Sequence, residues 1–131
     1  MTHPLVLFLN HLDSSANSTF NIEHYSDIPK GGTKPKPDPL QGRYANLTRQ
    51  QVEELIPQLQ EQNEAGAGIF IARNQCDGHR SEKTISRVRG VHADMDDVSP
   101  RELADLIRLI KPSIVVESSP GKYQLYWQLS E

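Results

Sequence analysis

Two aspartates stand two positions apart at the end of an apolar segment, a spacing that could support metal chemistry. Residues 90–97 read Gly-Val-His-Ala-Asp-Met-Asp-Asp. Successive side chains of a β-strand point to opposite faces, so His92, Asp94 and Asp96 would line one face. Two carboxylates this close repel each other unless a cation lies between them. Their oxygens suit Mg²⁺ or Mn²⁺, hard ions that also bind the phosphates on which two-metal phosphoryl transfer acts.

A turn is the alternative explanation of the same acids. Asp97-Val98-Ser99-Pro100 is typical of a turn that leads into a helix. Taken alone, the Asp-x-Asp spacing is common and favours the turn. Evidence from the rest of the sequence is therefore needed to distinguish a metal site from a turn.

Composition narrows the class of protein. The chain has 131 residues, a net charge of −3 and one cysteine, Cys76, which predicts one domain over residues 1–131 and no internal disulfide. The mild acidity excludes binding to nucleic acid through global charge, so any such contact needs a local basic patch. Without a signal peptide or an apolar run of about 18 residues, we expect a cytoplasmic protein with no membrane partner.

Hydrophobic periodicity predicts alternating strands and helices. Thr48 and Ser99 have the sequence signature of helix caps, Pro120-Gly121 that of a hairpin turn, and residues 4–13 favour a helix over a strand. Strands are expected at 19–25, 68–74, 87–96, 113–119 and 122–129. This order predicts an α+β fold of the ferredoxin-like (RRM-like) type, an antiparallel sheet with helices on one face and the other face open.

Residues 27–47 are expected to form a long surface loop within this domain. Residues 27–43 hold four prolines, three glycines and several cations, among them Lys34, Lys36 and Arg43. No core can be built from this composition. A solvated linker is favoured over an arm that tracks nucleic acid.

The last strand indicates which side chains the open face would carry. Alternation points one set toward the helices: Tyr123, Leu125, Trp127 and Leu129. It points the other set outward: Lys122, Gln124, Tyr126 and Gln128. If the two aspartates share that face, it combines metal-binding acids, a cation for phosphates and polar groups for a base or sugar. An ordinary solvated sheet face is the alternative.

Several segments resemble the archaeo-eukaryotic primase superfamily, and most closely the RepB-like primases of plasmids and phages. They are residues 69–74, 77–80 (Asp-Gly-His-Arg), 85–97 and 115–127, in a likeness that covers roughly residues 48–129. The resemblance implies that Asp94 and Asp96 hold catalytic Mg²⁺ or Mn²⁺. It implies that Ser119 and Lys122 contact the triphosphate of the incoming nucleotide. Gln124 stands where many primases carry a histidine, and the resemblance implies that it also binds the nucleotide.

The same resemblance leaves some roles open. Arg80, Arg87 and Arg89 would contact template or triphosphate, although a solvated strand end also explains the last two. His92 could assist the acids or be a core histidine. The family has a third acid downstream of the hairpin, so we expect these 131 residues to form the N-terminal part of a primase with an incomplete catalytic site.

Three functions follow as hypotheses. The first is a primase-like nucleotidyltransferase for plasmid or phage DNA replication, which takes a nucleoside triphosphate and a single-stranded DNA template. The second is a small binding protein that inhibits a host protein complex, such as an anti-CRISPR protein. The third is a single-stranded nucleic-acid-binding module, disfavoured because Tyr126 is the main aromatic residue of the expected open face.

Overall fold

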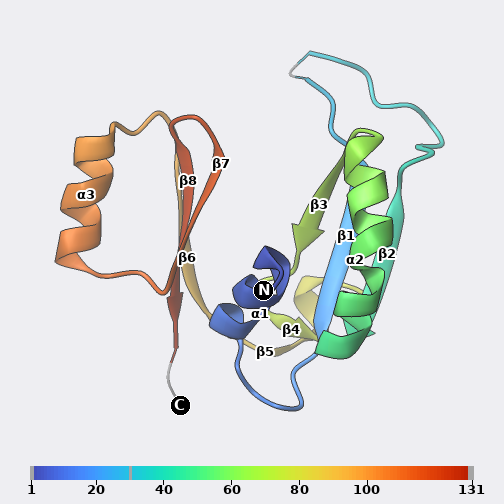
Figure 1. Ribbon diagram of the computed structural model, residues 1–131, viewed down its shortest axis with the longest axis horizontal. Coiled ribbons are helices and arrows are strands. Elements are labelled where there is room, and N and C mark those ends of the chain that lie inside the picture. Colours follow the sequence, from blue (N-terminus) through green and yellow to red (C-terminus); the bar gives the residue numbers. More distant parts are fainter. Residues whose placement is uncertain (1, 30, 130–131) are drawn as a thin grey trace. The chain divides into compact units, whose positions relative to one another are not determined.

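Strands and helices alternate along most of the chain, as the periodicity predicts. The computed structural model describes residues 2–29 and 31–129. The chain divides into two units, unit 1 with residues 1–15 and 88–131, and unit 2 with residues 16–87. Each unit combines helix with antiparallel sheet (Figure 1), which confirms the α+β class. That the whole chain forms one domain stays a prediction.

Unit 2 is built on an antiparallel sheet of three strands in the order β2-β1-β3. The strands are β1 (Phe20–Ser26), β2 (Gly42–Leu47) and β3 (Ala67–Ile71), and the helix α2 (Arg49–Glu64) connects β2 to β3. A separate pair, β4 (Gln75–Cys76) and β5 (Ile85–Arg87), flanks the short 3₁₀ helix η1 (Glu82–Thr84). The strands therefore do not form the single sheet that we expected.

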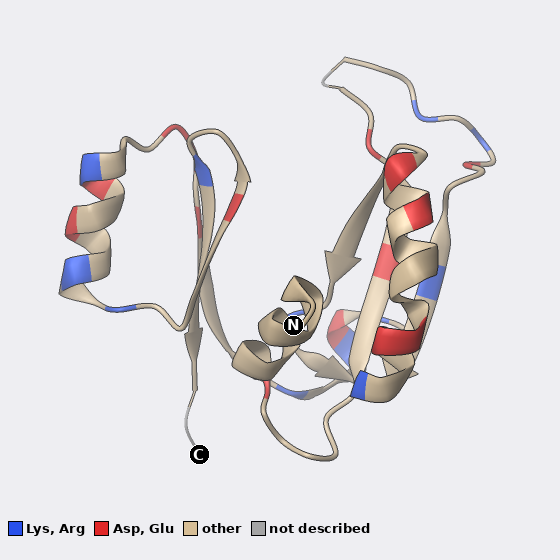
Figure 2. Ribbon diagram, in the orientation of Figure 1, with Lys and Arg blue, Asp and Glu red and all other residues tan. Residues whose placement is uncertain are grey.

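The helix α2 covers one face of the unit 2 sheet. Thr48 caps it through the predicted capping box with Gln51, and it continues through Pro57 to Glu64. The strand prediction for residues 19–25 is confirmed, since Phe20 and Ile22 are completely buried. Acidic residues recur along the helix (Figure 2): Glu53, Glu54, Glu61 and Glu64.

The predicted loop over 27–47 is wrong at its C-terminal end, where residues 42–47 form β2. Asp38 accounts for the difference. Its carboxylate accepts hydrogen bonds from the backbone N–H and the hydroxyl of Ser26, at 2.8 and 2.6 Å. The loop is thereby tied back to the end of β1, and the next residues pair with that strand.

Unit 1 contains a second antiparallel sheet, in the order β6-β8-β7. Its elements are α1 (Pro4–Leu12), β6 (Gly90–Met95), α3 (Pro100–Leu109), β7 (Ile114–Ser119) and β8 (Lys122–Gln128). The strand expected over 87–96 is in fact two strands, β5 and β6. Arg89 interrupts it, because its side chain is buried in an ion pair with Asp13, just after α1.

Helices contact both faces of the unit 1 sheet (Figure 1). On one face Leu125 is fully buried, and the indole N–H of Trp127 donates to the carbonyl of Ile110 at the end of α3. On the other face the ring of Phe8 in α1 meets that of Tyr126 edge-on, with centroids 6.0 Å apart. This corrects the expectation of helices on one face only.

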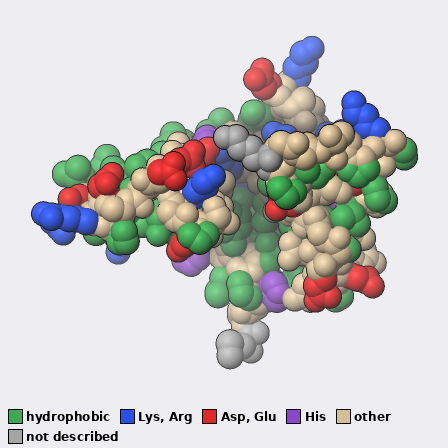
Figure 3. All heavy atoms as spheres, turned by 90° about the horizontal axis from the view of Figure 1, so that it is seen from above, with side chains coloured by type: hydrophobic (Ala, Val, Ile, Leu, Met, Phe, Trp, Pro, Cys, Tyr) green, Lys and Arg blue, Asp and Glu red, His purple; other side chains and the backbone are tan. Residues whose placement is uncertain are grey.

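The surface carries charges of both signs. Blue and red side chains are interspersed with green hydrophobic ones on the face shown in Figure 3, in line with a net charge of only −3. Within residues 2–29 and 31–129, no helix is long and apolar enough to cross a membrane.

Candidate functional site

The site predicted from the sequence lies at one end of the unit 1 sheet. Asp94 on β6 pairs with Gln124 on β8, and paired residues of an antiparallel sheet project from the same face. Lys122 lies two positions before Gln124 and shares that face. Asp94 and Lys122 are both exposed. An acid, an amide and an ammonium group are thus brought together on one face of the sheet, at one of its ends.

The β7–β8 hairpin closes this end of the sheet. Ser119 pairs with Lys122 across the turn, where Gly121 has a φ of +78° that favours glycine. The N–H of Val98 donates to the carbonyl of Gly121 at 3.1 Å. This bond ties the segment that follows the aspartates to the hairpin turn, so the acids and the turn occupy the same end of the sheet.

The strand geometry holds for Asp94 but not for Asp96. β6 ends at Met95, and Asp97 adopts a φ of +54°. Asp96 lies between Met95 and Asp97, outside the strand, and is exposed. Alternation along the strand therefore does not place the Asp96 side chain. The chain turns at Asp97 and enters α3, whose cap is Ser99 as predicted.

A hydrogen bond orients Gln124. The hydroxyl of Tyr126 donates to its Oε1 at 3.1 Å, so the two N–H groups of the amide are directed away from that oxygen and can meet a ligand. His92 pairs with Tyr126 across the strands, with ring centroids 6.4 Å apart. His92 is exposed, so it is not a core histidine.

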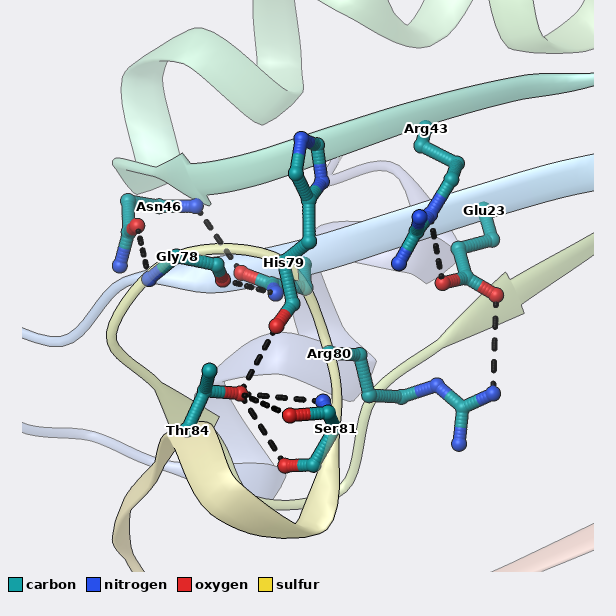
Figure 4. Close-up of polar contacts among 9 residues, drawn as sticks. Glu23, Arg43, Asn46, Gly78, His79, Arg80, Ser81 and Thr84 are labelled. Carbon is teal, nitrogen blue, oxygen red and sulfur yellow. Dashed lines mark hydrogen bonds and ion pairs between the residues drawn. The ribbon is translucent and has the colours of Figure 1, made fainter.

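The three arginines have different environments. Arg89 donates from Nε to Asp13 Oδ2 at 2.8 Å, and its side chain is 2% exposed. A buried guanidinium is not presented to nucleic acid, which corrects the role expected for it. Arg87 is half-buried on β5, whereas Arg80 is exposed, with Nη2 3.6 Å from Glu23 Oε2 (Figure 4). Arg80 and Arg87 belong to unit 2, and the acids belong to unit 1.

The loop before η1 is fixed by two asparagines that the sequence analysis did not single out. Asn46, at a φ of +54°, accepts from the N–H of Gly78 at 2.9 Å and donates to the carbonyl of Cys76 at 2.7 Å. Asn21 donates to the carbonyl of Gly78 at 2.8 Å. These bonds hold the backbone that carries His79 and Arg80 (Figure 4). The only signal in the sequence is the tolerance of asparagine for positive φ.

Among the described residues, no three His, Cys, Asp or Glu side chains form a group that could hold a metal ion. Mg²⁺ commonly binds one or two carboxylates and completes its shell with water and substrate phosphates. The donor chemistry of Asp94 and Asp96 fits that mode.

The chain matches the model of a known protein family. The family model of the RepB DNA-primase N-terminal domain matches residues 38–131, which is more than half of the chain. Neither the curated proteins nor the solved structures contain a match. The match includes both aspartates, the hairpin and the loop of Arg80, and it indicates a primase-like role in replication. The chain belongs to the family of RepB DNA-primase N-terminal domains.

Proposed function

We propose that this domain serves metal-dependent nucleotidyl transfer during the priming of plasmid or phage DNA replication. One observation carries the proposal. The pairing of Asp94 with Gln124 sets a carboxylate beside the hairpin that carries Ser119 and Lys122. The family membership supports the same chemistry. The substrates are a nucleoside triphosphate and a single-stranded DNA template.

Each side chain has a role that follows from its charge and position. Asp94 and Asp96 hold Mg²⁺ or Mn²⁺, which neutralises charge on the reacting phosphate when it is bound. The Lys122 ammonium and the Ser119 hydroxyl bind the triphosphate as cation and hydrogen-bond donor. Gln124, oriented by Tyr126, donates its amide N–H groups to the nucleotide.

Titration calorimetry with Mn²⁺ and a nucleoside triphosphate tests the proposal. Asp94→Asn removes one negative charge while it preserves the shape of the side chain. We expect it to weaken Mn²⁺ binding at least tenfold, since carboxylate charge is the main attraction for the ion. Glu117→Gln is the matched control. Glu117 pairs with Tyr123 and therefore lies on the opposite face of the same sheet.

The two variants give opposite expectations. Glu117→Gln should bind Mn²⁺ and nucleotide as the unmodified protein does. If Asp94→Asn also binds like the unmodified protein, or if the unmodified protein takes up neither ligand, the proposed function is wrong.

A further inference from the structure

The face of the unit 2 sheet opposite α2 carries aromatic and charged side chains. Glu23 on β1 pairs with Arg43 on β2 and with Phe70 on β3, so these three side chains share one face. Tyr25, two positions after Glu23, lies on the same face. The buried Ile22 projects to the other face, which α2 covers. The α2-free face of this sheet is therefore defined by Glu23, Tyr25, Arg43 and Phe70.

Two rings stack on the α2-free face. The centroids of Tyr25 and Phe70 are 4.6 Å apart, with an angle of 13° between the ring planes. Phe70 is 45% exposed. Gly68 makes this arrangement possible, because a Cβ there would lie 2.9 Å from ring carbons Cε2 and Cζ of Phe70. The Phe70 ring thus lies against Gly68, stacked with Tyr25, and remains partly exposed.

One cation lies over these rings, and two more are held by Glu23, which pairs with Phe70 across the strands. The ammonium of Lys34 lies 4.3 Å from the centroid of the Tyr25 ring. Lys34 Nζ is also 3.7 Å from Asp38 Oδ2. The carboxylate of Glu23 holds two guanidinium groups, with Oε1 3.3 Å from Arg43 Nε and Oε2 3.6 Å from Arg80 Nη2 (Figure 4). Arg43 and Arg80 share this single carboxylate, so the pair retains net positive charge. The bonds of Asn21 and Asn46 to Gly78 fix the loop that brings Arg80 here.

The opposite side of unit 2 has the reverse charge. Four glutamates line α2, with Arg49 as its one basic residue. A polyanion is repelled from the helix side and attracted to the α2-free face. Exposed aromatic rings among cations are the features with which proteins bind single strands, since every base can stack and every phosphate is negative. Reading a duplex would instead need an element that enters a groove.

We propose that the α2-free face of unit 2 binds single-stranded DNA. Phe70 stacks on a base, and Arg43 and Arg80 contact backbone phosphates. The inference deepens the proposed function, since it assigns template contact to unit 2. It does not depend on the metal site of Asp94, and its test is run without metal.

Fluorescence anisotropy with a labelled oligo-dT in EDTA provides the test. Phe70→Leu keeps an apolar side chain but removes the ring, and it should weaken binding about tenfold or more. Arg80→Ala and Arg43→Ala should each weaken binding and lower the salt dependence by about one counterion. Arg49→Ala, which removes a cation from the helix side, is the charge-matched control and should bind normally.

A further variant and a duplex probe complete the design. Gly68→Ala displaces the Phe70 ring without deleting it and should also weaken binding. A DNA duplex of the same sequence should bind less well than the single strand. The inference is overturned if the single strand does not bind, or if Phe70→Leu and Arg80→Ala bind it as well as Arg49→Ala does.

The result can be separated from that of the proposed function. Phe70→Leu should bind Mn²⁺ and nucleotide as the unmodified protein does, because Phe70 is not among the residues to which metal or nucleotide binding is assigned. Loss of metal binding in Asp94→Asn would leave the DNA result in EDTA as it stands. Each proposal can therefore fail alone.

Discussion

Arg89 Nε donates to Asp13 Oδ2 over 2.8 Å, and the two side chains are 2% and 5% exposed. The pair joins the residue before β6 to the residue that follows α1. Because both charged groups are buried away from water, each charge depends on the other to offset the free-energy cost of its desolvation. The α1 helix, which covers part of the sheet face that holds Asp94, is fixed by this contact.

Asp13→Ala should lower the free energy of unfolding by about 3–5 kcal/mol, because it leaves a buried guanidinium without its carboxylate. Urea denaturation followed by circular dichroism measures the change. Asp105→Ala is the control, since Asp105 forms an exposed pair with Arg108 at 3.8 Å. Its loss should cost less than about 1 kcal/mol, and equal costs for the two variants would contradict the structural role of Asp13.

Asp38 makes stability depend on pH in the acid range. The hydroxyl of Ser26 is the main cause that lowers the pKa of Asp38 from 3.8 to about 2; burial opposes it, and the N–H groups of Ser26 and Leu40 and the charge of Lys34 add to it. When the pKa of a carboxyl group is lower in the folded than in the unfolded state, the group stabilises the protein at pH values above its unfolded-state pKa. The contribution is therefore complete above pH 3.8 and is lost as the pH falls toward about 2.

Ser26→Ala should raise the pKa of Asp38 toward its ordinary value, because the 2.6 Å hydrogen bond to Oδ1 is removed. Titration of the Asp38 side-chain carboxyl carbon by NMR measures this directly. The acid-induced loss of stability should then begin at higher pH than in the unmodified protein. Ser86→Ala, which removes a hydroxyl bonded to the carbonyl of Gln75, should leave the Asp38 titration unchanged.

Gly121 should be required for the shape of the hairpin. Gly121→Ala forces a side chain into the left-handed region at a φ of +78°, at a cost of about 1–2 kcal/mol. Both the free energy of unfolding and nucleotide binding should fall, since Ser119 and Lys122 flank the turn. Lys122→Ala is the comparison: it should weaken triphosphate binding with little change in stability. Equal free energies of unfolding for Gly121→Ala and Lys122→Ala would contradict the structural role of Gly121.

Local patterns were sufficient to predict several elements. Phe20 and Ile22 alternate with polar residues, and Thr48 and Ser99 precede complete capping patterns, so each element is specified by its neighbours in sequence. The hairpin at 120–121 was found for the same reason. From the hairpin and the alternation of β8, the neighbourhood of Asp94, Lys122 and Gln124 could be expected before the pairing was known.

Contacts between distant residues could not be predicted in this way. Asp13 and Arg89 are 76 positions apart, and an arginine next to a strand gives no local sign that it is buried. The contact between Phe8 and Tyr126, which places α1 on the sheet face, is equally non-local. The division of the strands among three separate sheets follows from such contacts. For this reason the predicted single sheet with one open face was wrong, although its strands were largely right.

Tyr126 should act as a positioning residue for Gln124. Tyr126→Phe removes the 3.1 Å hydrogen bond to Oε1 of Gln124 but keeps the ring that contacts Phe8. A bond of this kind contributes about 1 kcal/mol, so nucleotide affinity measured by calorimetry should fall about fivefold, with Mn²⁺ affinity unchanged. Tyr123→Phe, on the opposite face of β8, is the matched control and should bind nucleotide normally. If Tyr126→Phe binds nucleotide as tightly as Tyr123→Phe does, the hydrogen bond from Tyr126 does not position the Gln124 amide for the nucleotide, because its loss then has no effect on nucleotide affinity.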